Sequence, residues 1–147
     1  MEIRRAGLGD ATSAANVYIA SLASLDFLPR LHTDDELRAF VGRLLEEQEV
    51  WVAEDGGGIL GLAALTSDML SHLYVHPDAQ GRGAGTALLA KTKERRPEGF
   101  TFWVFQRNER ARRFYEAHGC RVVQLTDGAG NDEKTPDALY AWTPGEV

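Results

Sequence analysis

The stretch VHPDAQGRGAGTALLAK, residues 75–91, constrains the fold more than any other part of the chain. It follows an apolar run and places Gly81, Gly83 and Gly85 at alternate positions, just before a segment with helical spacing of its apolar residues. Glycine costs backbone entropy, so three of them indicate a connection from which side chains are excluded. A strand, a glycine turn and a helix N-terminus together favour an anion, because free N–H groups and the helix dipole attract negative charge.

The segments before the glycines predict a strand, two helices and then three strands. Asp10 stands as the N-cap before the first helix, and Thr33 with Glu36 forms the capping box that opens the second. The second and third strands are joined by the turn DGGG, which predicts a hairpin. The expected strands cover residues 2–6, 50–54, 59–65 and 70–75.

The segments after the glycines predict a helix over 82–96, a strand over 100–105, a second helix and two closing strands. Asn108 is the expected N-cap of the second helix, and Gly119 is expected to end it. The order is that of a mixed α/β (α+β) fold with an antiparallel first half. We expect a single domain over residues 1–147.

Composition excludes several classes of function. The net charge of −6 disfavours nucleic acid as a partner, because phosphate binding needs a basic face. The single cysteine, Cys120, excludes an internal disulfide and fits a reducing compartment. The sequence has no apolar run near 18 residues and no signal-peptide core, so we expect a cytoplasmic protein that does not bind membranes.

Two familiar phosphate-binding motifs do not fit the glycine segment. A P-loop needs a Gly-Lys pair, and the sequence has none. The dinucleotide fingerprint needs a third glycine at a position that here holds Thr86 or Leu88. By spacing alone, a glycine turn that merely connects a strand to a helix remains an alternative.

Two motifs resemble the GNAT superfamily of N-acetyltransferases. Residues 80–85, QGRGAG, are similar to its Q/R-x-x-G-x-G/A signature, and residues 108–120, NERARRFYEAHGC, are similar to its asparagine-containing helix. Cys120 stands where phenylalanine is usual. The order of elements matches over nearly the whole chain. The resemblance implies a mostly antiparallel sheet of six to seven strands with about four helices, splayed to leave a slot for acetyl-CoA.

The resemblance also implies how acetyl-CoA would bind. The glycine segment would hold the pyrophosphate through backbone amides, and the preceding strand would pair with the pantetheine arm. For Arg82, a solvated side chain is the alternative to a phosphate contact. No metal is implied. The implied cofactor-binding residues are Leu73, Tyr74, Val75, Gln80, Gly81, Arg82, Gly83, Ala84, Gly85, Thr86 and Asn108.

Tyr115 is implied to be the acid that reprotonates the leaving thiolate, with a core aromatic residue as the alternative. The base is harder to assign. The base positions of better-known members fall on Met69 and Ser71, which cannot accept a proton, and Trp103 replaces the glutamate of the ribosomal-protein N-terminal acetyltransferases. His72 is expected to be structural, because strand alternation turns it away from the face of Ser71.

In this superfamily two loops border the acceptor pocket, and here they span residues 25–36 and 126–142. They make Asp26, Asn131 and Glu133 candidate acceptor-binding residues and His32 a candidate base. Their excess of carboxylates favours a cationic amine as the acceptor.

The expected function is transfer of an acetyl group from acetyl-CoA to a primary amine of a small molecule or peptide. A non-catalytic module that senses acyl-CoA is the main alternative. A nucleotide-binding switch domain is a weaker one, since the sequence lacks the phosphate-binding lysine and a metal-ligand cluster. A homodimer formed by exchange of the C-terminal strand would be typical of the superfamily.

Overall fold

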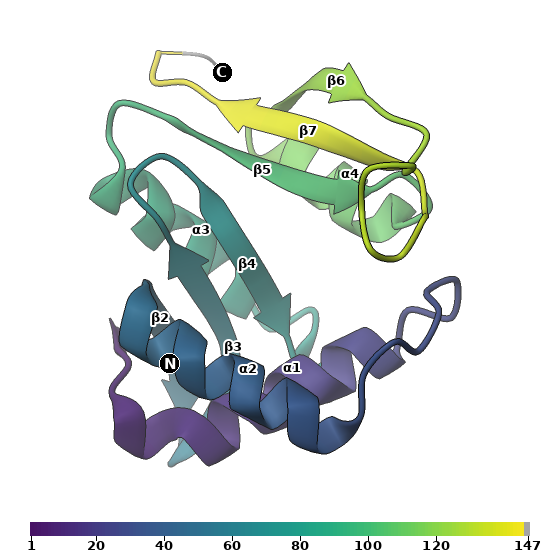
Figure 1. Cartoon of the computed structure of the whole chain (residues 1–147). Helices are drawn as coiled ribbons and strands as arrows, with labels where there is room; N and C mark the ends of the chain where they lie inside the picture. Colours follow the sequence, from purple (N-terminus) through teal and green to yellow (C-terminus); the bar gives the residue numbers. More distant parts are fainter. Residues whose placement is uncertain (146–147) are drawn as a thin grey trace.

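In the computed structural model, which describes residues 1–145, seven strands form two sheets that meet along one edge (Figure 1). The first sheet has the order β1-β2-β3-β4 and the second the order β5-β7-β6, and the pairs within each sheet are antiparallel. The expected mixed fold is confirmed. The strands are β1 (Glu2–Arg5), β2 (Glu49–Asp55), β3 (Gly58–Leu65), β4 (Leu70–Val75), β5 (Phe100–Phe105), β6 (Arg121–Leu125) and β7 (Asp137–Trp142).

The two sheets touch where β4 and β5 begin. Met69 and Thr101 form an isolated parallel bridge, and the Thr101 N–H donates to the carbonyl of Asp68 at 3.2 Å. Beyond this bridge the two strands diverge, as Figure 1 shows. The splay that the resemblance implies is therefore present, and it leaves one edge of β4 without a strand partner.

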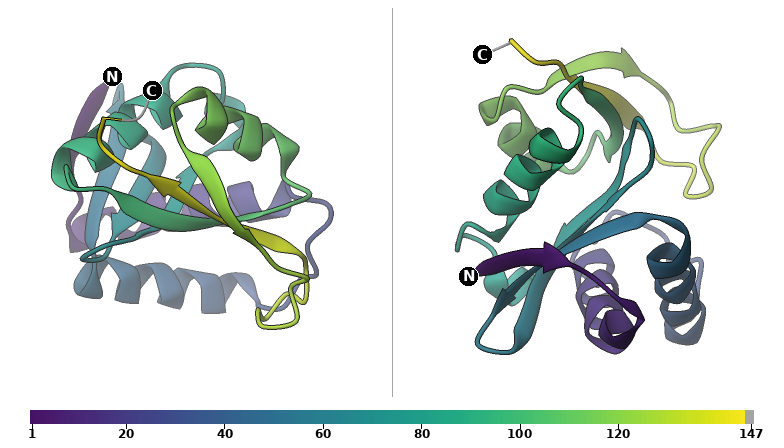
Figure 2. Two further views of the ribbon diagram at one scale, coloured as in Figure 1. Left: turned by 90° about the horizontal axis from the view of Figure 1, so that it is seen from above. Right: turned by 90° about the vertical axis from the view of Figure 1, so that its left-hand side faces the viewer.

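Two pairs of helices cover opposite sides of the sheets (Figure 2). The helices are α1 (Ala11–Ala23), α2 (Asp34–Glu47), α3 (Ala84–Arg95) and α4 (Glu109–Ala117), with short 3-10 turns η1 (Leu8–Asp10) and η2 (Pro77–Ala79). One core lies between α1, α2 and the first sheet, and includes Val17, Val41 and Leu62. A second core lies between α3, α4 and both sheets, and includes Leu88 and Phe102.

Two of the three expected helix caps form as the sequence predicts. Thr33 Oγ1 accepts from the Glu36 N–H at 3.1 Å while the Glu36 carboxylate accepts from the Thr33 N–H at 2.8 Å. Asn108 accepts from the Ala111 N–H at 3.2 Å. Asp10 occupies the predicted N-cap position of α1, but its side chain does not cap that helix, because the carboxylate accepts from Arg4 at 2.8 Å and from the Gly7 N–H of the preceding turn at 2.9 Å. The Arg4 hydrogen bond, above all, lowers the pKa of Asp10 to about 2.

Gly61 lets the centre of the first sheet pack closely against its neighbours. A Cβ there would lie 2.8 Å from the Tyr74 carbonyl oxygen and 3.1 Å from Leu88 Cδ1. We expect Gly61→Ala to lower the free energy of unfolding by about 1–3 kcal/mol, measured by urea denaturation. The control is Gly42→Ala on α2, where a Cβ meets nothing within 4 Å and should stabilise the helix. Equal stability changes in the two variants would contradict this account.

His72 is held in an aromatic cluster, with ring centroids 5.9 Å from Tyr18, 5.4 Å from Phe40 and 5.9 Å from Tyr74. Burial lowers the pKa of its imidazole from 6.5 to about 4. The folded protein therefore resists a proton that the unfolded chain accepts. The stability that depends on neutral His72 is fully present above pH 6.5 and is lost as the pH falls toward 4.

We accordingly expect the free energy of unfolding to fall between pH 7 and pH 5, before most carboxylates titrate. Binding of one proton by the unfolded chain changes the free energy of unfolding by at most about 1.4 kcal/mol per pH unit. Urea denaturation at several pH values should give a shallower dependence for His72→Gln than for the wild type. The same slope for both proteins would show that His72 does not cause it.

Candidate active site

The three glycines around the start of α3 serve two different purposes. Gly81 and Gly83 have φ angles of +82° and +89°, a conformation that residues with a side chain rarely adopt. Gly85 has an ordinary φ, but a Cβ there would lie 3.4 Å from the Phe114 ring. Because Gly83 cannot be helical in this conformation, α3 begins at Ala84 rather than at Arg82 as expected.

The N-terminus of α3 is left open. No side chain caps it, and its first turn contains no acidic residue. The N–H groups of the first helical turn have no carbonyl partner within their own helix. An uncapped helix end of this kind, preceded by a glycine turn, is suited to bind a phosphate group.

A cavity of about 750 Å³, here called the slot, runs from this helix end between β4 and α4. Every residue that was predicted to bind acetyl-CoA lines the slot, except Arg82. Ser21 and Ser24 of the α1 region and Arg110 and Phe114 of α4 also line it, and the sequence analysis did not single them out. The residues of the slot therefore fit a long ligand with a phosphate at one end.

The side chains of Arg82 and Thr86, which were predicted to contact phosphate, interact with other residues of the protein. The Arg82 guanidinium pairs with the Asp55 carboxylate at 2.8 Å on the surface, an interaction that contributes little to stability. The Thr86 hydroxyl lies 3.3 Å from Nε2 of His118, whose Nδ1 is 2.7 Å from the Phe114 carbonyl oxygen. A carbonyl only accepts, so Nδ1 donates and, in the neutral ring, Nε2 accepts from Thr86.

The open edge of β4 presents backbone groups to the slot. The His76 N–H donates to Leu60 of β3 at 2.8 Å, whereas the Val75 carbonyl accepts from the Ser21 hydroxyl at 2.9 Å on the opposite side. Because backbone groups alternate along a strand, those of Leu73 also turn away from β3. An extended ligand could pair with them as an added strand.

Two tyrosines, Tyr74 and Tyr115, line the slot, and a third, Tyr18, packs against Tyr74. Tyr18 and Tyr115 are 8% and 7% exposed, and the Tyr74 ring lies 5.0 Å from that of Tyr18. Within residues 1–145 none of these three hydroxyls has a hydrogen-bond partner. Every fully buried side-chain nitrogen or oxygen in that range does have one. The three hydroxyls therefore reach accessible space. Burial raises the pKa of each tyrosine, so each stays protonated at neutral pH.

A second cavity of about 600 Å³, here called the loop cavity, lies between β5 and residues 126–136, the β6–β7 loop. Trp103 and Phe105 line it from β5, and Asn131 and Glu133 from the loop. Neither Trp103 nor Phe105 was predicted from the sequence to line a pocket. Strand alternation could have found them, because Phe102 and Val104 face the core and their neighbours must face the other way.

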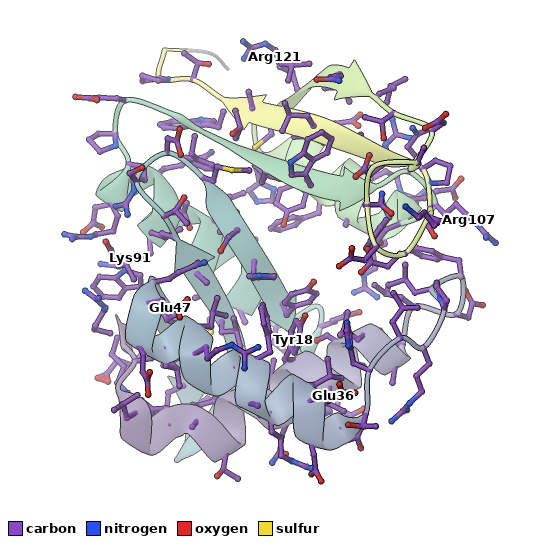
Figure 3. All side chains as sticks on the ribbon, viewed as in Figure 1. Tyr18, Glu36, Glu47, Lys91, Arg107 and Arg121 are labelled. Atoms are coloured by element: carbon purple, nitrogen blue, oxygen red, sulfur yellow. The ribbon has the colours of Figure 1, made fainter. Side chains whose placement is uncertain are left out.

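The connection between α1 and α2, residues 24–33, borders the same region. Its Phe27 packs edge-on against Phe105 with ring centroids 6.0 Å apart, and the Arg107 guanidinium lies 5.4 Å from the Phe27 ring. Figure 3 labels Arg107 near the β6–β7 loop. The two loops that were predicted to border the acceptor pocket thus lie on the same side of the molecule (Figure 1).

The geometry supports the predicted acceptor residues unequally. Asp26 and His32 are exposed in the α1–α2 connection and line neither cavity, so their roles stay predictions. Asn131 lines the loop cavity, but its amide donates to the Thr135 carbonyl at 2.8 Å and accepts from the Thr135 N–H at 3.2 Å. It holds the loop together. Glu133 is the predicted acid that faces the cavity without such bonds.

In the part of the chain that the structure describes, no three His, Cys, Asp or Glu side chains are grouped to hold a metal ion. No helix of residues 1–145 is long and apolar enough to cross a membrane.

Comparisons with known proteins agree with this geometry. Residues 46–121 match the family model described as an acetyltransferase (GNAT) domain. The peptidyl-lysine N-acetyltransferase YiaC of Escherichia coli is 33% identical over 100 residues, which cover 67% of this chain and 66% of YiaC, just under two thirds of that protein.

Solved structures share the whole fold. The apo form of YjaB from Escherichia coli is 25% identical, with a TM-score of 0.80 and 98% of each chain covered. The yncA protein of Salmonella typhimurium, solved with its cofactor acetyl-CoA, is 22% identical, with a TM-score of 0.74, covering 100% of this chain and 95% of yncA. The expected enzyme class, an acetyl-CoA-dependent N-acetyltransferase, is supported by the family and by the names of these relatives. The chain belongs to the GNAT family of acetyltransferases.

Proposed function

We propose that the protein transfers the acetyl group of acetyl-CoA to the side-chain amine of a lysine in a peptide or protein. The observation that carries this proposal is the slot, which joins an uncapped helix N-terminus to the open edge of β4 and to the Tyr115 hydroxyl. The name of YiaC supports a lysine as the acceptor. The acidic wall of the loop cavity supports a cationic one.

The chain offers a partner for each part of acetyl-CoA. The free N–H groups of Ala84, Gly85 and Thr86 would hold the pyrophosphate, and the backbone of residues 73–75 would pair with the pantetheine arm. The surface pair of Arg82 with Asp55 is weak enough for Arg82 to turn toward a phosphate. Asn108 would touch the arm while capping α4.

Acetyl-CoA supplies an activated thioester, and the chain supplies donors around it. A backbone N–H of residues 73–75 would stabilise the oxygen that gains negative charge. The new N–C bond forms as the C–S bond breaks, so the neutral amine loses one proton and the sulfur gains one. Tyr115 lines the slot, and burial raises its pKa, so that its hydroxyl keeps its proton at neutral pH; within residues 1–145 this hydroxyl has no hydrogen-bond partner. These observations support Tyr115 as the donor of that proton.

The alternative of a non-catalytic acyl-CoA sensor receives less support. A sensor needs the slot alone, whereas this protein also has the Tyr115 hydroxyl in the slot and a second cavity that acidic residues line. Met69 and Ser71 cannot act as bases, and the Ser71 hydroxyl is bound to Gln48 and to the Ala64 carbonyl. The amine proton would therefore leave by another route.

We expect Gly83→Asp to weaken CoA binding at least about tenfold, or about 1.4 kcal/mol, because it adds a negative side chain at the phosphate site. Isothermal titration calorimetry measures the affinity. Gly57→Asp is the matched control, since Gly57 has a similar φ of +87° in the β2–β3 turn, where a Cβ meets nothing within 4 Å. A folded Gly83→Asp protein with unchanged CoA affinity would rule out this phosphate site.

We expect Tyr115→Phe to lower kcat by ~10²- to 10⁴-fold with little change in the KM for acetyl-CoA, since the variant keeps the ring and loses the proton donor. Steady-state kinetics with a lysine peptide measure both. Tyr140→Phe is the control, because that hydroxyl donates to Glu116 at 2.6 Å and accepts from Arg112 at 3.0 Å in a structural network. If Tyr115→Phe loses stability while kcat stays unchanged, Tyr115 is only a core residue.

A further inference from the structure

Two serine side chains at the end of α1 line the slot, and the hydrogen of each hydroxyl is already used. The Ser21 hydroxyl donates to the Val75 carbonyl at 2.9 Å, and the Ser24 hydroxyl donates to the Ser21 carbonyl at 2.6 Å. A carbonyl oxygen only accepts, so the direction of both hydrogen bonds is fixed. Each serine oxygen is therefore left with lone pairs alone, and a ligand in the slot can bind it only with an N–H or O–H group.

The end of α1 has the same polarity as these two oxygens. α1 ends at Ala23, Ser24 follows as its C-cap, and the last turn contains no basic residue. The C-terminal end of a helix carries a partial negative charge, whereas the N-terminal end, which α3 presents to the same slot, carries a partial positive charge. The slot thus lies between one helix end that favours a phosphate and another that favours hydrogen-bond donors.

The serine oxygens add hydrogen-bond acceptors where the other walls of the slot provide few. Of the two β4 carbonyls that turn away from β3, that of Val75 already accepts from Ser21, which leaves that of Leu73. On the α4 side, Asn108 Oδ1 already accepts from the Ala111 N–H at 3.2 Å. Within residues 1–145 the amide nitrogen of Asn108 makes no hydrogen bond, so this side chain offers the slot a donor.

The pantetheine arm of acetyl-CoA has the donors that such a wall requires. It carries two amide N–H groups, and a β-alanine unit separates their nitrogens. That unit is one carbon longer than an amino-acid residue, so it spans roughly 5 Å when extended. Side chains three residues apart on a helix, as in Ser21 and Ser24, are about 5–6 Å apart. The two serines therefore match the two amides in both hydrogen-bonding role and spacing.

We propose that Ser21 and Ser24 bind the two amide N–H groups of the pantetheine arm and so position acetyl-CoA in the slot. This inference rests on the proposed function. Ser21 has a second effect, because its hydroxyl joins the arm to the Val75 carbonyl and fixes the end of β4 beside α1 (Figure 1). The Ser21 side chain is buried, whereas Ser24 is exposed at the mouth of the same wall, so Ser21 should contribute more to the affinity.

The first experiment measures CoA affinity by isothermal titration calorimetry, without any acetyl acceptor. We expect Ser21→Ala and Ser24→Ala each to weaken binding about two- to tenfold, since each removes one hydrogen bond between uncharged groups. The control is Ser13→Ala, the same substitution on an exposed position of α1 that lines neither cavity, and it should leave the affinity unchanged. Circular dichroism and thermal unfolding establish that each variant is folded.

The second experiment compares kcat/KM for three acetyl donors with one lysine peptide. Acetyl-pantetheine keeps both amides and lacks the nucleotide, whereas N,S-diacetylcysteamine keeps one amide. We expect each serine substitution to lower kcat/KM by the same factor with acetyl-CoA and with acetyl-pantetheine. With N,S-diacetylcysteamine at least one of the two substitutions should lose its effect, because the amide that it would bind is missing.

The outcomes separate this inference from the proposed function. Unchanged CoA affinity in the folded Ser21→Ala and Ser24→Ala proteins overturns the serine site. Equal losses with all three donors also overturn it, because the serines would then support the shape of the slot rather than bind the arm. A wild-type protein that binds CoA, with the expected losses in both variants, but acetylates no lysine peptide supports the serine site and overturns only the proposed acetyl acceptor.

Discussion

The divergence of β4 from β5 is the constraint on which the rest of the structure depends. The strands are tied at Met69 and Thr101 and then separate, so that one edge of β4 has no strand beside it. Unpaired backbone groups at a sheet edge favour the addition of another extended chain. Here α1 covers part of that edge through Ser21, and the slot occupies the remainder. The fold thus supplies a backbone-lined site before any side chain is specified.

The N-terminal N–H groups of α2, α3 and α4 are treated in two different ways: some are capped by a side chain and others are not. At α2 and α4 the chain supplies its own caps, Thr33 and Asn108. At α3 it supplies Gly83, which has no side chain to cap with. An uncapped helix end leaves several donors to water or to a ligand. Under the proposed function, a phosphate of the ligand would take the place of the missing cap of α3, and the glycines before this helix would leave room for it.

The order of the strands and helices and two helix caps could be predicted from the sequence, because each depends on neighbours in the chain. The residues expected to bind acetyl-CoA came from the resemblance to the GNAT superfamily, because they lie on segments far apart in the chain. Other features depend on contacts between distant segments. Asp10 has the right chemistry for a cap, but Arg4 competes for its carboxylate. His32 lies in an acidic loop, yet the path of that loop leaves it exposed. The contact of Tyr18 with Tyr74 follows from how α1 packs on the first sheet, and no local pattern encodes that packing.

The acidic wall of the loop cavity and the attack on the thioester place opposing demands on an amine acceptor. A carboxylate favours the ammonium form, whereas attack on a thioester requires the neutral amine. Under the proposed function, the two demands are met at different stages. In an open, wet cavity the ion pair is well solvated. When the acceptor and acetyl-CoA displace water, both charges lose hydration, and burial then favours moving a proton from the ammonium to the carboxylate, which neutralises both groups. A cavity with aromatic and acidic walls is therefore suited both to select a cation and to release it as a nucleophile.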